Sequence, residues 1–100
     1  MGFPEVERLD AQLNVIGGLK ELVVKRMREM GVTIEVDDGP RFVPSVEFKH
    51  LPGEENWDVS VKEIETLAIH ASKLIVANKL GRLIFDRDEA RNSIKVAIKD

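Results

Sequence analysis

The sequence predicts a single α+β domain over residues 1–100, in which a long helix covers a small, mainly antiparallel sheet. Apolar residues recur every three or four positions over residues 61–80, which is the spacing of a helix with a buried face. Over residues 32–50 apolar and polar residues alternate instead, on both sides of a turn-forming Asp-Asp-Gly-Pro run, and this pattern indicates a hairpin. A length of 100 residues with 43% hydrophobic residues suits one domain with one core.

The N-terminal segment predicts a helix over residues 4–30. An initial proline suits the first helical position, the following apolar residues keep a helical spacing, and a glycine stands where the helix should end. Gly17-Gly18 interrupts the pattern, so the segment is either one helix with a weak point or two helices with a hinge. In an alternative, residues 9–16 contain a strand that ends at these glycines, and the chain follows the ferredoxin-like order βαββαβ.

The second strand of the predicted hairpin contains Pro44, which lacks the N–H that a central strand donates to its neighbour. We therefore expect this strand to lie at a sheet edge or to carry a bulge. An edge strand presents unpaired backbone groups and can pair with another chain.

The long helix carries both a start signal and a stop signal. Ser60 and Glu63 have the spacing of a capping box, so the helix is expected over residues 61–80, with a glycine directly after it. A short strand at 82–86 follows. The terminal segment, residues 87–99, fits a helix and a strand equally well.

This helix also has more apolar surface than one core-facing stripe requires. A second stripe lies about 120° or more around the helix from the first and consists of Ile69, Val76 and Leu80. Either the N-terminal helix covers this stripe or a second copy of the chain does. Together with the expected strand edge, the second possibility favours a self-associating, non-enzymatic interaction or assembly module, and therefore a homo-oligomer, as the leading prediction of function. Binding to a different protein partner stays open.

A basic stripe would form on a helical terminal segment from residues spaced four apart, which are Arg87, Arg91, Lys95 and Lys99. Alternatively these side chains are solvated, or they balance the acidic middle of the chain, where residues 31–60 carry seven acids and two bases. A nucleic-acid-associated accessory protein is therefore the second prediction of function. The net charge of −3 and the small number of aromatic residues weaken it.

Residues suited to catalysis or metal binding are sparse. The chain has no cysteine, and its two histidines, His50 and His70, lack further ligands at metal-binding spacing. Turn formation and solvation explain the acids at 37–38 and 54–58, and Trp57 is expected to fold onto the core. A small enzyme or metal-binding protein is thus the third prediction, and no catalytic residue, metal ligand or cofactor is assigned.

The first residues lack the basic and apolar runs of a secretory signal, and no stretch approaches the roughly 18 apolar residues of a membrane span. A cytoplasmic, soluble protein without membrane contact is the expectation. An excess of Glu and Lys without Cys is typical of a thermophilic source.

Overall fold

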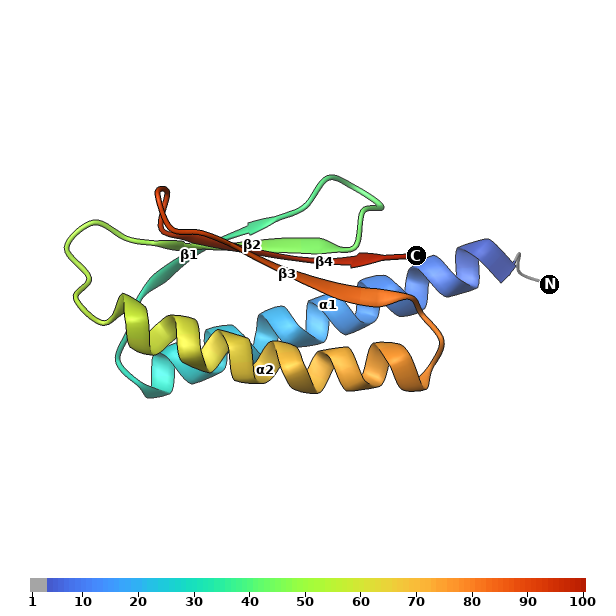
Figure 1. Ribbon diagram of the computed structural model, residues 1–100, viewed down its shortest axis with the longest axis horizontal. Helices are drawn as coiled ribbons and strands as arrows, with labels where there is room; N and C mark the ends of the chain where they lie inside the picture. The colour runs from blue at the N-terminus through green and yellow to red at the C-terminus, as the bar shows by residue number, and fades with distance from the viewer. Residues whose placement is uncertain (1–3) are drawn as a thin grey trace.

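In the computed structural model, which describes residues 4–100, a four-stranded antiparallel sheet lies on two helices (Figure 1). The elements in chain order are α1 (Pro4–Glu29), β1 (Ile34–Asp38), β2 (Ser45–His50), α2 (Trp57–Ala77), β3 (Arg82–Asp88) and β4 (Ser93–Lys99). The predicted α+β class is confirmed. The alternative order βαββαβ is not formed, because residues 9–16 belong to α1 rather than to a strand.

Helix α1 runs unbroken through Gly17 and Gly18. Its buried face continues on both sides of the two glycines through Ile16, Leu19, Val23 and Met27. Burial of these side chains outweighs the roughly 1 kcal/mol that each glycine costs a helix relative to alanine. The helix stops as predicted before Gly31, whose φ of 71° lets the Val32 N–H donate to the Met27 carbonyl.

The strands lie in the order β1-β2-β4-β3, so β1 and β3 form the edges and β2 is central. The expectation that Pro44 places the second strand at an edge or in a bulge is therefore wrong. Strand β2 begins at Ser45, directly after the proline, and its register with β4 runs without a break. The missing N–H thus falls outside the ladder, while the Pro44 carbonyl accepts a hydrogen bond of 3.0 Å from the Ile98 N–H.

The terminal segment, residues 87–99, contains the end of β3, a turn and the whole of β4, so a terminal helix does not form. Its period of two decides the outcome: Ile94, Val96 and Ile98 are buried against the helices, whereas the residues between them face away. Strand β4 lies between β2 and β3, and α2 therefore carries the chain across it.

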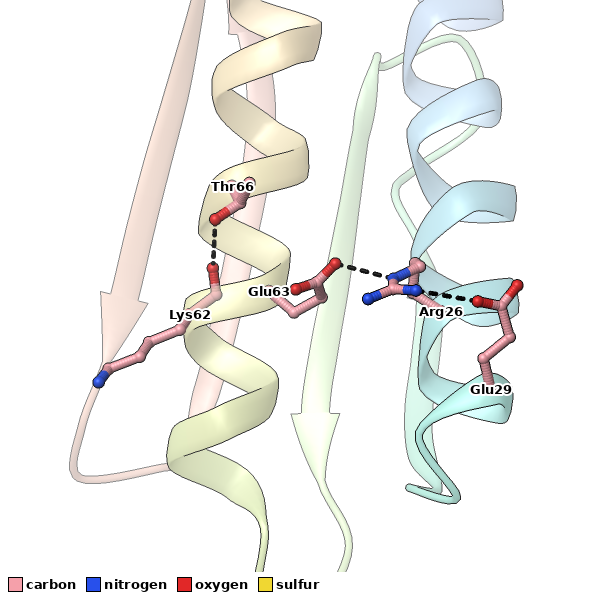
Figure 2. Close-up of polar contacts among 5 residues, drawn as sticks. All are labelled: Arg26, Glu29, Lys62, Glu63 and Thr66. Atoms are coloured by element: carbon pink, nitrogen blue, oxygen red, sulfur yellow. Dashed lines mark hydrogen bonds and ion pairs between the residues drawn. The ribbon is translucent and has the colours of Figure 1, made fainter.

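Helix α2 begins at Trp57, four residues before the predicted start. Ser60 is not its cap but a fully buried helical residue, whose Oγ donates to the Asn56 carbonyl at 3.1 Å. Glu63 does not complete a capping box either. It reaches across to α1 and accepts a bond of 2.9 Å from Arg26 Nε, as Figure 2 shows.

Arg26 links the two helices near the end of α1 and the start of α2. Its guanidinium also donates to Glu29 at 2.9 Å, within α1 (Figure 2). These two bonds raise the pKa of Arg26, and the bond to Glu63 contributes most. The helices run antiparallel beneath the sheet, and the shared core lies between the two layers (Figure 1).

Candidate functional site

The sheet has one covered face, which packs on the helices, and one open face. The strand register shows which face each side chain is on, because directly paired residues share a face. On the edge strand β3 the covered face receives Leu83, Phe85 and Arg87, and the open face receives Arg82, Ile84, Asp86 and Asp88.

Helix α2 contacts β3, whereas α1 contacts β2 and β4. The predicted second stripe of α2 is therefore on the flank away from α1, and α1 does not cover it. Ile69 and Val76 remain 51% and 65% exposed.

Leu80 does not belong to the predicted stripe. The helix ends at Ala77, and the chain then turns through Asn78 and Lys79, so a helical position no longer applies to Leu80. Its side chain is buried in the core, and its carbonyl accepts a hydrogen bond of 2.8 Å from Gln12 Nε2.

A shallow groove of about 360 Å³ separates α2 from β3. Its lining consists of Glu65, Ala68, Ile69, Ser72, Leu83 and Phe85. We use the name α2–β3 edge surface for Ile69 and Val76 of α2 together with the half-buried Leu83 and Phe85 of β3. The sequence predicted the helical half of this surface, but it did not reveal that Ile69 shares a groove with Leu83 and Phe85.

The backbone of β3 adds hydrogen-bond donors and acceptors to the same surface. All seven residues of β3 pair with β4 without a bulge, and none of them is proline. Among the described residues, β3 has no strand on its other side, so the backbone groups that point away from β4 have no ladder partner there. Of the devices that normally protect an edge, β3 lacks bulges and prolines but carries charged residues, which are Arg82, Asp86, Arg87 and Asp88.

The four basic residues of the predicted stripe are separated by the hairpin. Arg87 lies on the covered face, where its guanidinium is 3.5 Å from Asp58. Arg91 lies in the turn after β3, and Lys95 and Lys99 lie on the open face of β4.

Arg91 and Lys95 line a polar cavity of about 400 Å³ on the open face. Five acids share this cavity with them: Asp37, Asp38, Glu47, Asp86 and Asp88. Five acids against two bases give the lining a net negative charge, which repels phosphate groups.

Some of the acids on this open face form ion pairs with Lys49. Lys49 Nζ lies 2.6 Å from Asp37 and 3.7 Å from Glu47. The hydrogen bond to Asp37 is the main cause of a raised pKa of Lys49. Ser45 is buried beneath Gly39, and its hydroxyl has no partner within residues 4–100.

The two histidines have different surroundings. His50 Nε2 contacts the Glu54 carbonyl, and its ring centroid is 5.5 Å from that of Trp57, which lies in the core as expected. His70 is exposed on α2. Over the described part of the chain, no three His, Asp or Glu side chains are placed to hold a metal ion.

Two smaller apolar exposures were not predicted from the sequence. Leu22 and Leu74 flank a groove between the two helices. Phe42 lies at the tip of the β1–β2 loop with a φ of 67°, and the Arg41 guanidinium carbon is 4.9 Å from its ring centroid.

These features define a two-layer α+β protein whose β3 edge is flanked by apolar helix surface. Comparison with protein-family models, with curated proteins and with solved structures finds no match to this chain. In the part of the chain that the structure describes, neither helix is long and apolar enough to cross a membrane.

Proposed function

We propose that this protein is a small, non-enzymatic assembly module that associates with a second copy of itself through the α2–β3 edge surface. The observation that carries the proposal is the exposure of Ile69 and Val76 beside the unpaired edge of β3. Burial of apolar side chains favours association, and a partner strand supplies hydrogen bonds to the backbone groups that it removes from water.

The chemistry of the surface supports binding rather than a reaction. It offers aliphatic and aromatic side chains next to main-chain donors and acceptors, which is the combination that strand addition uses. A second copy presents the same combination, and two-fold dimers are the commonest assemblies of identical chains.

The proposal predicts that wild-type protein has twice the monomer mass of 11.3 kDa at tens of micromolar. Ile69→Asp places a charge in the proposed interface twice per dimer, once from each copy. We expect it to weaken association by about 100-fold or more, since each fully buried Ile contributes about 1.5–3 kcal/mol. Light scattering after gel filtration measures the mass.

Leu74→Asp is the matched control, because Leu74 is on the same helix and is 56% exposed, but it faces the groove toward α1. This variant should keep the wild-type mass. A wild-type protein that is monomeric at tens of micromolar contradicts the proposal. Equal loss of association in both variants also contradicts it.

Association with nucleic acid has less support. The helix that would align the four basic residues is replaced by a hairpin, and Arg87 is directed toward Asp58. Acids outnumber bases around Arg91 and Lys95.

A further inference from the structure

We infer that the second copy adds to β3 as an antiparallel strand about a two-fold axis through Ile84, so that the two four-stranded sheets join into one. This inference rests on the proposed self-association and specifies its geometry. An axis perpendicular to the sheet keeps both helix layers on the same side. Ile69 and Val76 of each copy then face the α2 helix of the other.

The charges of the two edges distinguish β3 from β1. On the open face β1 carries only Glu35 and Asp37. Antiparallel pairing of β1 with its own copy would therefore place acid opposite acid, either Glu35 with Asp37 or each residue with itself. Like charges directly opposite each other destabilise a sheet. The β1 edge thus resists self-pairing.

Strand β3 has mixed charges, and one register matches the side chains of residues 82–86. With Ile84 on the axis, Arg82 lies opposite Asp86 of the other copy, and Leu83 lies opposite Phe85. The open face then gains two ion pairs around an Ile84 pair, and the covered face gains two apolar pairs. Both kinds of pair stabilise adjacent antiparallel strands.

The neighbouring registers lack this complementarity. A one-residue slip would exchange the two faces of the partner strand, so only shifts that keep the helices on one side are allowed. With Phe85 on the axis, Arg82 meets Asp88, but Ile84 meets Asp86 and Leu83 meets Arg87. With Asp86 on the axis, the Asp86 side chains of the two copies lie opposite each other and repel.

The isolated chain leaves Arg82 in an unfavourable position. Its direct partner on β4 is Lys99, another cation. No ion pair of Arg82 is formed within residues 4–100. Asp86 of a second copy would supply the missing counter-charge, while the first copy's own Asp86 stays opposite Lys95.

Charge exchange tests this register. Arg82→Asp alone and Asp86→Arg alone each replace both intermolecular ion pairs by repulsion, and each should weaken the dimer by about 10- to 30-fold. An equimolar mixture of the two variants restores opposite charges in the mixed dimer and should recover wild-type affinity. The double variant, Arg82→Asp with Asp86→Arg, should also recover it. Sedimentation velocity across a concentration series measures each dissociation constant.

Folding serves as an internal control. Arg82→Asp puts an acid opposite Lys99, so the monomer should keep wild-type circular dichroism and thermal stability. Loss of association in this variant therefore reports the interface rather than unfolding.

Introduced cysteines test the axis independently, because the native chain has none. Directly opposite residues of antiparallel strands have Cα atoms about 4.5–5.5 Å apart, which is within disulfide range. Ile84→Cys should form a covalent dimer when oxygen and a copper-phenanthroline catalyst oxidise the two thiols. Phe85→Cys and the β1 control Glu35→Cys should cross-link much more slowly.

The outcomes separate the two proposals. Recovery in the mixture together with rapid Ile84→Cys cross-linking supports the register. A wild-type dimer that is insensitive to Arg82→Asp, or that cross-links faster through Phe85→Cys or Glu35→Cys, overturns the register and leaves self-association standing. A wild-type monomer at tens of micromolar overturns both.

Discussion

Lys79 occupies a backbone conformation that helix ends usually reserve for glycine. Its φ is 55°, and its N–H donates to the Val76 carbonyl at 3.1 Å, while the Leu80 N–H donates to Ile75 at 2.9 Å. This pair of bonds is the Schellman arrangement, in which the left-handed residue follows the cap. A side chain at that position costs about 1 kcal/mol in backbone strain.

We therefore predict that Lys79→Gly raises the free energy of unfolding by about 0.5–1 kcal/mol, because it removes the strain while keeping both hydrogen bonds. Urea denaturation followed by circular dichroism measures the change. Gly81→Ala is the contrasting control. Gly81 has a φ of 103°, and an added Cβ would collide with the Lys99 carbonyl, so this variant should be destabilised. A lower stability of Lys79→Gly would show that the lysine side chain contributes more than its strain costs.

At the scale of the elements, α1 contains two glycines that its own packing does not require. A Cβ added at Gly17 or at Gly18 would meet no atom within 4 Å. Each glycine weakens the helix by about 1 kcal/mol relative to alanine. The long apolar face of α1 compensates for this weakness.

We predict that Gly17→Ala and Gly18→Ala each raise the free energy of unfolding by about 0.5–1 kcal/mol. Thermal and urea denaturation of the two single variants and of the double variant measure the effect, and the two gains should add. Gly39→Ala provides a comparison that should lose stability, since its Cβ would collide with the Ser45 side chain. No gain in either α1 variant would mean that the helix is not weakened at these positions.

The elements with strong local signals were predictable from the sequence. Helix α1, the β1–β2 hairpin and α2 follow from apolar periodicity and turn residues. The start of α2 was misplaced, because the capping spacing of Ser60 and Glu63 is coincidental: tertiary contacts bury the serine and direct the glutamate to Arg26. Its end was misplaced, because Lys79 rather than Gly81 adopts the left-handed conformation after the cap. Residues 87–99 fit two periods, and only pairing with β2 and β3 selects the strand.

The candidate surface was predictable only in part, for the same reason. Ile69 and Val76 stand out on a helical projection. The proximity of Ile69 to Leu83 and Phe85 depends on which strand lies at the edge, and that order is a long-range property. Pro44 pointed to the wrong edge because its position just outside β2 is not visible in the alternation of residues.

At the scale of the whole molecule, the two-layer arrangement leaves the two sheet edges with different character. The β1 edge is acidic on its open face, whereas the β3 edge combines opposite charges with an apolar flank on α2. Assembly through β3 would extend the sheet and leave its open face accessible. The proposed assembly therefore uses the β3 edge and leaves the β1 edge unpaired.

Backbone hydrogen exchange distinguishes the two sheet edges, because it reports pairing at each edge in the unmodified protein. We predict that those amides of residues 82–86 that point away from β4 become more protected as the protein concentration rises, while the amides of β1 do not change. Ile69→Asp should remove the concentration dependence. Equal and concentration-independent exchange at the β3 and β1 edges would contradict self-association through β3.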